Sequence, residues 1–499
     1  MTLKEKYPIN LHNTLSGKKE QFEPIHEEYV GMYVCGPTVY SDVHLGNVRT
    51  FLNFDVIYRY LMYVGYKVRY VRNITDVGHL ESDADEGEDK IAKKARLQQL
   101  EPMEIVQQYT NDFHDVLKQF NILPVSIEPS ATGHIVEQIE MVQQLIDKGL
   151  AYEVNGSVYF DVSKYDKDHN YGKLSGRKIE ELMESGRTLD SQDEKRNKID
   201  FALWKKASPT HIMRWPSPWG EGFPGWHLEC TVMSTKYLGE SFDIHGGGMD
   251  LIFPHHECEI AQSVGSTGKE PVKYWLHSNM LTVNGQKMSK SLGNSFLPRE
   301  LFAGTHQLLQ KGFSPMVVRF FMLQSHYSST LDFSNEALIA AEKGYKRLME
   351  GYKVSKNLPF EQNDVDGELE TKTKELIDGL FLNMGDDFNT AKTLAVLFEI
   401  TTMMNNFKTG NIKTGYLTQE TFAELVSRYQ GFITEVLGLR EEAETSNDLL
   451  NGVIEVLMKL RQDAKEARDY QLSDKIRDDL KNLGIVLKDS KEGTEYSIA

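Results

Sequence analysis

The sequence predicts an α/β protein in which a parallel-sheet domain, split by an insertion, is followed by a helical region and a small C-terminal module. Three observations predict this fold. A strand-like run, a helical run and a second strand-like run follow one another near the N-terminus, the same pattern resumes at Phe242–Ile244, and amphipathic helices dominate after about residue 330. At 499 residues the chain is too long for one compact core, so several domains are expected.

The first α/β unit begins with the strand-like run Tyr29–Val34, which ends in the turn Cys35-Gly36-Pro37. Apolar residues then recur at helical spacing from Leu45 to Leu61, and Tyr66–Val71 is a second β-rich run. A strand, a helix and a strand in this order indicate a right-handed crossover between parallel strands.

The pattern loosens between about residues 120 and 225, where short strands at Ala151–Tyr152 and Ser157–Phe160 stand among polar loops; this segment is interpreted as an insertion. After Phe242–Ile244 comes a run of three glycines, interpreted as a turn, and then a helix that begins near Pro254. A further strand over Met280–Val283 is expected to turn at Asn284-Gly285.

The region after residue 330 is expected to be helical. Amphipathic stripes cover Leu338–Tyr352, Ala391–Phe407 and Phe422–Leu437, whereas Asn357–Thr371 and Arg440–Asn447 are interpreted as polar linkers. The last residues predict helices over Leu449–Ala467 and from Ser473 to Gly484, followed by a terminal hairpin.

These patterns give the expected domain limits. They are 1–120 and 226–300 for the two halves of the parallel-sheet domain, 121–225 for the insertion, 301–335 for a junction, 336–440 for the helical domain and 448–499 for the C-terminal module.

The composition, with 40% hydrophobic and 26% charged residues, is typical of a soluble globular protein. The N-terminal residues show neither the apolar core nor the cleavage site of a secretory signal, and no apolar run approaches the roughly 20 residues that cross a bilayer. A soluble, cytoplasmic protein is therefore expected. The net charge of −17 argues against nucleic-acid binding, although a large acidic protein can carry one basic face.

Two short motifs predict a site for a triphosphate. His44-Leu45-Gly46-Asn47 lies at the expected start of the first helix, where free amides and the helix dipole attract phosphate. His44 and Asn47 share a helix face, so both side chains can reach one ligand. Lys287-Met288-Ser289-Lys290-Ser291 places two lysines on a loop, where they can stabilise charge that develops on phosphate in a transition state.

The segment Pro254-His255-His256-Glu257-Cys258-Glu259 is dense in metal-binding groups, and His255 and Glu259 project from one face of its helix. Cys258 also lies within reach of that face. A thiolate is a softer ligand than a carboxylate, so the residues alone rank Cys258 slightly above Glu259.

The chain has three cysteines, which cannot all pair in disulfides within it. An isolated buried cysteine is usually a small apolar core residue. Cys35 and Cys230, however, can join a histidine and a carboxylate in a zinc site that leaves room for a further ligand.

The motifs HLGN and KMSKS together resemble the HIGH and KMSKS pair of class I aminoacyl-tRNA synthetases, with Asn47 in place of the second histidine. This replacement keeps a hydrogen-bonding side chain but removes an imidazole that can carry charge. Over essentially its whole length, the chain resembles the cysteinyl-tRNA synthetase family. The segments that carry this resemblance are YVCGPTVY, NITD, DFALWK, GWHLEC, DIHGGGMD, FPHHECEIAQS, KMSKSLGN, LDFS, DDFNTAKTLAVLFE and ARDYQLSDKIRDDL.

The resemblance implies a Rossmann-type catalytic domain and a set of site residues. One zinc ion per subunit would be bound by Cys35, Cys230, His255 and Glu259, which reverses the ranking of Cys258 and Glu259. The amino-acid pocket would be lined by Gly36, Thr75, Trp226 and His245, although the residues alone favour a core position for Trp226. ATP, with Mg²⁺, would be bound by His44, Asn47, Asp250, Lys287 and Lys290, with Asp250 on the ribose.

The implied activity is the ATP-dependent activation of L-cysteine to cysteinyl-adenylate and its transfer to tRNA-Cys. His44, Asn47, Lys287 and Lys290 would be the catalytic, charge-stabilising residues. Residues 336–440 would contact the anticodon stem and residues 448–499 would also contact tRNA, in a monomeric protein without a membrane partner.

Two alternatives remain at this point. A ligase that joins cysteine to a small amine would use the same catalytic core, but it would not need the roughly 170 residues after residue 330. A tRNA-binding relative without catalysis is the other alternative, and the intact KMSKS motif and zinc residues argue against it.

Overall fold

The computed structural model describes residues 1–78, 80–82, 86–181, 194–209, 211–289, 292–442, 446–483, 485–490 and 493–498. The chain divides into two compact units, Met1–Arg440 and Glu441–Ala499. None of the described helices is long and apolar enough to cross a membrane. Within the first unit, the domain limits expected from the sequence stay predictions.

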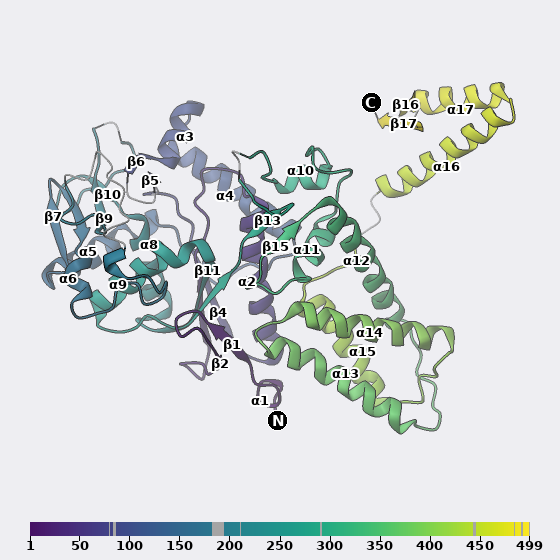
Figure 1. Ribbon diagram of the computed structural model, residues 1–499, viewed down its shortest axis with the longest axis horizontal. Helices are drawn as coiled ribbons and strands as arrows, with labels where there is room; N and C mark the ends of the chain where they lie inside the picture. Colours follow the sequence, from purple (N-terminus) through teal and green to yellow (C-terminus); the bar gives the residue numbers. More distant parts are fainter. Residues whose placement is uncertain are drawn as a thin grey trace. The chain divides into compact units, whose positions relative to one another are not determined.

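The first unit is built around a four-stranded parallel sheet (Figure 1). Its strands are β3 (Val30–Val34), β4 (Val68–Arg72), β11 (Phe242–Gly248) and β12 (Val272–Ser278), in the order β12-β11-β3-β4. The chain therefore runs outward from β3 to one edge and from β11 to the other. This confirms the predicted split parallel-sheet fold, and it makes the boundary between β3 and β11 the switch point where such sheets bind ligands.

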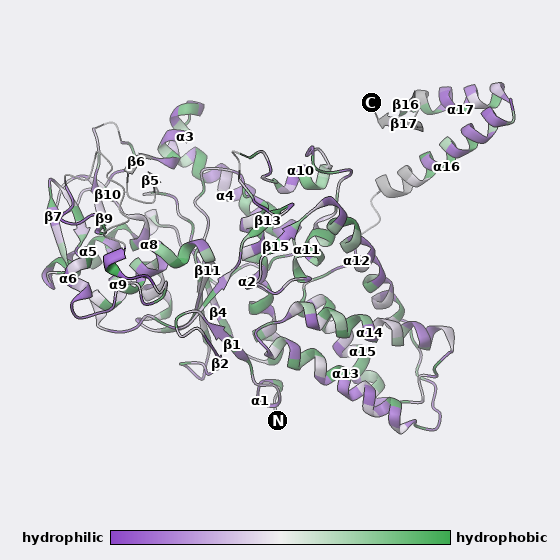
Figure 2. Cartoon of the chain, in the orientation of Figure 1, coloured by the Kyte–Doolittle hydropathy of each residue, from purple (hydrophilic) through white to green (hydrophobic). Residues whose placement is uncertain are grey.

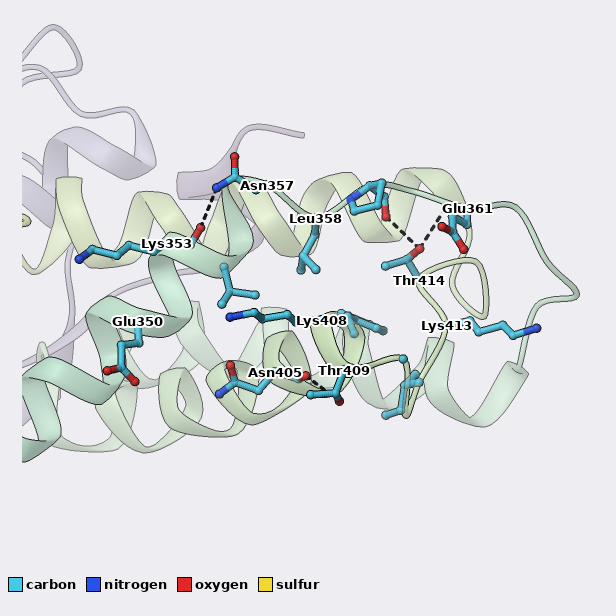
Figure 3. A pocket seen from close by; sticks show the side chains of 15 residues that line it. Glu350, Lys353, Asn357, Leu358, Glu361, Asn405, Lys408, Thr409, Lys413 and Thr414 are labelled. Atoms are coloured by element: carbon cyan, nitrogen blue, oxygen red, sulfur yellow. Dashed lines mark hydrogen bonds between the residues drawn. The ribbon is translucent and has the colours of Figure 1, made fainter.

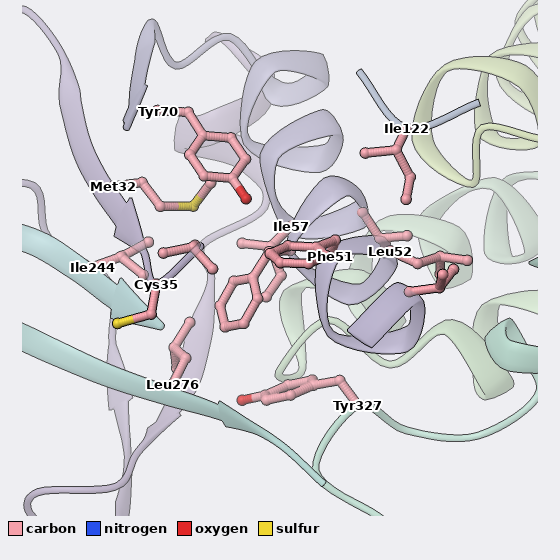
Figure 4. Packing of buried hydrophobic residues seen from close by; sticks show 14 of the residues in the cluster. Met32, Cys35, Phe51, Leu52, Ile57, Tyr70, Ile122, Ile244, Leu276 and Tyr327 are labelled. Atoms are coloured by element: carbon pink, nitrogen blue, oxygen red, sulfur yellow. The ribbon is translucent and has the colours of Figure 1, made fainter. Parts of the chain in front are cut away.

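Helix α2 (Leu45–Val64) connects β3 to β4 and packs on the sheet, as predicted. Figure 4 shows Phe51 and Ile57 of α2 facing Ile244 and Leu276 of the sheet. Leu52 lies on another side of the helix, near Ile122. Helix α2 is buried on nearly all sides, charged residues included, so it is a central element rather than a surface cover.

The glycine run was expected to form a turn, and this prediction was wrong. Gly246, Gly247 and Gly248 are the last residues of β11, where they pair in register with β12. Pairing with β12 along all three glycines, and with β3 at Gly246, keeps these residues extended despite their weak strand preference. The expected helix near Pro254 begins as the irregular turn η3 (Ile252–His256) and becomes the regular helix α9 (Glu257–Thr267).

The predicted insertion contains a four-stranded antiparallel sheet in the order β10-β9-β8-β7. Its strands are β7 (Ala151–Val154), β8 (Ser157–Phe160), β9 (Phe201–Lys206) and β10 (Gly222–Pro224). The elements η1 (Thr132–His134), α5 (Ile135–Asp147), α6 (Val162–Asp166) and α8 (Trp226–Leu238) surround it.

The remaining elements of the first unit belong neither to these two sheets nor to the helical part. They are α1 (Leu3–Lys6), β1 (Asn10–Asn13), β2 (Lys18–Gln21), β5 (Leu80–Ser82), β6 (Glu86–Asp89), α3 (Lys90–Gln98), α4 (Pro102–Gln119), η2 (Met249–Leu251), β13 (Leu281–Val283), β14 (Gln286–Lys287), α10 (Pro298–Ala303) and β15 (Leu331–Phe333). The turn at Asn284-Gly285 joins β13 to β14 as predicted, with positive φ at both residues.

The helical part follows, with α11 (Pro315–Leu323), α12 (Asn335–Ser355), α13 (Gly367–Gly385), α14 (Thr390–Thr409), α15 (Gln419–Gly431) and η4 (Phe432–Val436). Asn357–Thr371 was expected to be a linker throughout, but α13 already begins at Gly367. Its first turns are hydrophilic, as Figure 2 shows, so they carry no apolar stripe. The Asp366 carboxylate caps them by accepting the N–H groups of Glu368 and Leu369.

The second unit contains α16 (Ser446–Glu466), α17 (Tyr470–Asn482) and a hairpin of β16 (Ile485–Ser490) and β17 (Gly493–Ile498). The hairpin was predicted, whereas Gly484 lies outside the described residues. Helix α17 begins before the expected Ser473, because the Asp469 carboxylate accepts the Leu472 N–H. Ile454, Leu480 and Ile485 form the small core of the second unit.

One buried cluster of charges joins α2 to the helical part. The Asp55 carboxylate accepts hydrogen bonds from Arg59 at 2.8 Å and from Arg319 at 2.6 Å, and all three side chains are buried. Arg319 also donates to the carbonyls of Phe120 and Leu437. The cluster thus ties α2, α11 and the chain after η4 together.

Asp55→Asn should lower the free energy of unfolding by about 3–5 kcal/mol, because it leaves two buried guanidinium groups without their counter-ion. Urea denaturation followed by circular dichroism measures this. Asp42→Asn is the matched control, since Asp42 pairs with Arg299 at the surface and should cost at most about 1 kcal/mol. Equal losses in the two variants would contradict a special role for the cluster.

Candidate metal and nucleotide site

The predicted site residues gather at the switch point. Cys35 directly follows β3, and its N–H donates to the Gly246 carbonyl of β11 at 3.1 Å. Gly36 comes next, and its N–H donates to the Asn73 side chain at 2.8 Å. A Cβ at residue 36 would stand 1.6 Å from the Asn73 carbonyl oxygen, so only glycine allows this close approach.

Two overlapping sets of four buried donors meet beside Cys35. One set is the predicted Cys35, Cys230, His255 and Glu259, and the other is Cys35, His245, His256 and Glu259. Within each set the donor atoms lie within 4.8 Å of one another. These two sets are the metal-binding groups found among the described residues.

The orientation of His255 favours the first set. Its Nδ1 lies 2.8 Å from Nδ1 of His227, which fixes the ring and turns Nε2 toward Glu259 Oε1, 3.2 Å away. This Nε2 is buried and makes no hydrogen bond of acceptable geometry. A ring held through one nitrogen, with the other aimed at a thiolate and a carboxylate, is arranged as metal-ligating histidines are.

His256 is held in a similar way, with Nδ1 2.8 Å from His277 and Nε2 3.3 Å from Cys35 Sγ. His245 lies 2.9 Å from Glu259 Oε2. The sequence indicated no role for His256 or His227, although the His255-His256 pair is visible in it. What places them is the contact between α8, η3 and the sheet.

The charges suit a cation. Burial disfavours the Cys230 thiolate, but the hydrogen bond from Cys35 and the charge of His255 outweigh it and lower the Cys230 pKa to about 6. Burial likewise opposes protonation of His255, but Cys230 and Glu259 raise its pKa to about 10. Burial and Cys230 hold the pKa of Cys35 well above its usual value. Two thiols, an imidazole and a carboxylate, buried together, fit zinc.

Cys258 lies apart from both donor sets. Its Sγ is 3.5 Å from the Tyr171 hydroxyl, and it belongs to neither set of donors. On α9 it points to a different side from Glu259, whose carboxylate reaches Cys35. The geometry therefore favours Glu259 over Cys258 as the fourth ligand.

The residues expected to line an amino-acid pocket surround the donors. Trp226 is only partly buried, and its ring lies 4.5 Å from that of His255. Thr75 is buried and donates its hydroxyl to the Glu229 carboxylate. Glu229 was not predicted; it is 1% exposed, and its second oxygen has no hydrogen-bond partner among the described residues.

The nucleotide motifs lie at the same end of the sheet. His44 is the N-cap of α2, where its Nδ1 accepts the Asn47 N–H and the Asn47 side chain accepts the His44 N–H, both at 3.3 Å. Asn47 therefore supports the start of the helix that was expected to receive phosphate. Asp250 is exposed in η2, just beyond β11.

Lys287 ends β14 and is exposed, whereas Lys290 lies outside the described residues. The loop after Lys287 is closed by Asn294, whose side chain accepts the Ser289 N–H at 2.8 Å and donates to the Lys287 carbonyl at 3.2 Å. A Cβ at Gly46 would stand 3.1 Å from Met288 Cε, so the loop lies directly against the start of α2.

A separate groove of about 800 Å³ lies in the helical part, between the ends of α12 and α14 (Figure 3). Lys353, Lys408 and Lys413 line it together with Glu350 and Glu361. None of the predicted site residues lines this groove, and its mixed charges single out no ligand.

Comparison with known proteins identifies the family. Residues 21–343 match the family model of the tRNA synthetases class I (C) catalytic domain, and residues 382–441 match the DALR domain. The chain is 54% identical to the cysteine–tRNA ligase of Porphyromonas gingivalis over 99% of both chains. It is 56% identical to that of Phocaeicola vulgatus, over 98% of this chain and 99% of the relative.

Solved structures agree on the fold. Mycobacterium tuberculosis methionyl-tRNA synthetase in complex with methionyl-adenylate has a TM-score of 0.58 at 15% identity, over 82% of this chain and 92% of that one. LeuRS of Agrobacterium radiobacter K84, in a ternary complex with tRNA and LeuAMS, has a TM-score of 0.55 at 11% identity, over 84% and 86%.

A pair of neighbouring histidines distinguishes the two donor sets. His255→Ala should weaken metal binding by more than about 100-fold, because it removes a ligand, whereas His256→Ala should cost no more than the 10–100-fold typical of a supporting residue. Metal analysis after dialysis against graded chelator measures both, and Cys258→Ser should retain one metal per chain. The reverse order of the two histidine variants would assign the metal to the second set.

Proposed function

The chain belongs to the cysteine–tRNA ligase family of class I aminoacyl-tRNA synthetases, and from this premise we propose how its residues activate L-cysteine with ATP and transfer it to tRNA-Cys. One observation carries the proposal. The buried donors Cys35, Cys230, His255 and Glu259 lie at the switch point of the sheet, beside the start of the helix that carries His44.

We propose that these four residues bind one zinc ion per chain. Zinc bound there would favour the thiolate form of the substrate sulfur, a form that the serine hydroxyl does not offer. Pocket size alone discriminates by only about 10–200-fold per methylene, so recognition of sulfur makes an editing step unnecessary.

The amino-acid pocket is proposed to consist of Gly36, Thr75, Trp226 and His245. Three of these are tied to the donor cluster: Trp226 by the tilted contact of its ring with that of His255, His245 by its contact with Glu259, and Thr75 through Glu229, the neighbour of Cys230. Their role is to hold the amino acid with its side chain directed at the metal and its carboxylate toward the nucleotide.

The nucleotide is proposed to lie on the first turn of α2, with its ribose at Asp250 and Mg²⁺ accompanying its phosphates. The cysteine carboxylate displaces pyrophosphate from the α-phosphorus, and the terminal ribose hydroxyl of tRNA then displaces AMP from the adenylate. No side-chain nucleophile is needed, so the protein contributes orientation and stabilisation of phosphate charge. His44, Asn47, Lys287 and Lys290 are the residues proposed for that stabilisation.

The match of residues 382–441 to the DALR domain supports tRNA, rather than a small amine, as the acceptor. We propose that residues 336–440 contact the anticodon stem, that residues 448–499 add further tRNA contacts, and that the protein acts as a cytoplasmic monomer.

Cysteine-dependent exchange of pyrophosphate into ATP should occur without tRNA, because activation precedes transfer. Serine at the same concentration should give no measurable exchange. With tRNA-Cys added, labelled cysteine should become acid-precipitable. Exchange that is accompanied by transfer to a small amine but not to tRNA would identify the alternative ligase, and no exchange by zinc-loaded protein would refute the activation step.

Lys287→Met should lower kcat of the exchange by about 10²–10³-fold, the usual effect of removing one group that stabilises transition-state charge. The KM for cysteine should stay within about twofold, since Lys287 lies on the nucleotide side. Lys273→Met is a matched control: Lys273 is an exposed lysine on β12 whose side chain donates to the Glu23 carbonyl. A rise in the KM for cysteine with unchanged kcat would contradict the assignment.

A further inference from the structure

The segment that carries Lys287 is flanked on both sides by hydrogen bonds to helix α2. Just upstream, the Asn53 side chain on α2 donates to the Ser278 hydroxyl at 2.8 Å. Downstream, the N–H of Leu45, the first residue of α2, donates to the Phe296 carbonyl at 3.0 Å. The described residues 279–289 and 292–295, called the signature segment below, therefore start and end on the helix that His44 caps.

Arg49 makes the strongest of these attachments. It lies on α2, just after Asn47, and is 1% exposed. One amino group of its guanidinium donates to the carbonyls of Asn279 at 3.0 Å and Met280 at 2.6 Å. The other donates to the carbonyls of His326 at 3.4 Å and Ser329 at 2.5 Å.

These four carbonyls come from two chain segments that enter neighbouring strands. Asn279 and Met280 precede β13, which leads to Lys287, and His326 and Ser329 precede β15, which pairs with β13 in parallel. A single planar fork thus fixes both strands to α2. Lysine cannot reproduce this, because its ammonium is a point donor on a flexible stem.

We propose that Arg49 is a positioning residue that sets where the signature segment stands relative to His44 and Asn47. This inference rests on the proposed function, in which Lys287 and the start of α2 act on the same triphosphate. Arg49 itself is buried beneath the two motifs and touches no reactant. Its contribution is to set the distance between Lys287 and the start of α2, which are the groups proposed to contact the triphosphate.

The expected consequence lies in kcat. A displacement of about 1 Å of a catalytic group can cost about 100-fold in rate. Loosening the segment leaves the donor cluster and the amino-acid pocket in place, because neither contacts Arg49. The loss should therefore appear in the chemical step and not in cysteine binding.

Arg59 supplies a matched control. It lies on the same helix, is 7% exposed, and donates to the carbonyls of Asn121 at 2.6 Å and Glu435 at 3.2 Å, far along the chain from the signature segment. The experiment compares Arg49→Lys and Arg49→Met with Arg59→Lys and Arg59→Met. For each zinc-loaded protein it measures thermal stability and the kcat and KM values of cysteine-dependent pyrophosphate exchange.

Both Arg49 variants should lose at least about tenfold in kcat, with the KM for cysteine within about twofold of the parent. The Arg59 variants should lose stability but keep kcat per folded molecule. If Arg49→Met does not fold, the kcat of Arg49→Lys, which keeps the charge, tests the proposal.

Unchanged kcat in the folded Arg49 variants would overturn the proposal. So would equal kcat losses in the Arg49 and Arg59 series, or failure of both Arg49 variants to fold while the Arg59 variants fold. Absence of exchange in the parent protein would instead refute the proposed function, so the two failures are distinguishable.

Discussion

The pairing of Asp55 with Arg59 and Arg319 is the interaction on which the arrangement of the first unit depends. Two guanidinium groups and one carboxylate are removed from water. This is tolerable because the guanidinium groups also donate to backbone carbonyls, and the second oxygen of the Asp55 carboxylate accepts the Leu123 N–H. Those carbonyls belong to residues that directly follow α4 and η4. The cluster thereby holds the middle and C-terminal turns of helix α2 against the helical part. The N-terminal turns, with the nucleotide motif, have a separate attachment through Arg49.

The position of helix α2 explains why the donor cluster and the groups expected to bind phosphate lie close together. Strands β3 and β11 are parallel neighbours, so Cys35, which follows β3, and His245 on β11 both reach the Glu259 carboxylate. Helix α2 begins at Leu45, ten residues after Cys35, and Arg49 attaches the Lys287 segment to it. The donor cluster and the groups expected to bind phosphate therefore both lie at the carboxyl end of β3.

The sequence predicted the parts of this arrangement that have local patterns. The strand, helix and strand around Cys35, the Asn284-Gly285 hairpin and the amphipathic helices have clear periodicity or turn residues. Helix α13 was missed over its first turns because they are polar. The glycines of β11 were taken for a turn because their pairing with β12, far along the chain, is not visible locally. Arg49 gave no signal, since a buried arginine in an apolar helix is recognisable only from the carbonyls that surround it.

The donor cluster could be predicted from the sequence only in part. Its ligand types were readable from the sequence, but the choice between Cys258 and Glu259 needed the family resemblance, and the competing set with His245 and His256 needed the fold. Fully deprotonated, two thiolates and a carboxylate would place three negative charges in a buried space. The protein avoids this by keeping a proton on Cys35 and on His255, whose pKa values are raised. A divalent cation would take over the neutralising role of those protons, which is why a site that is so unfavourable for bare charge is well suited to a metal.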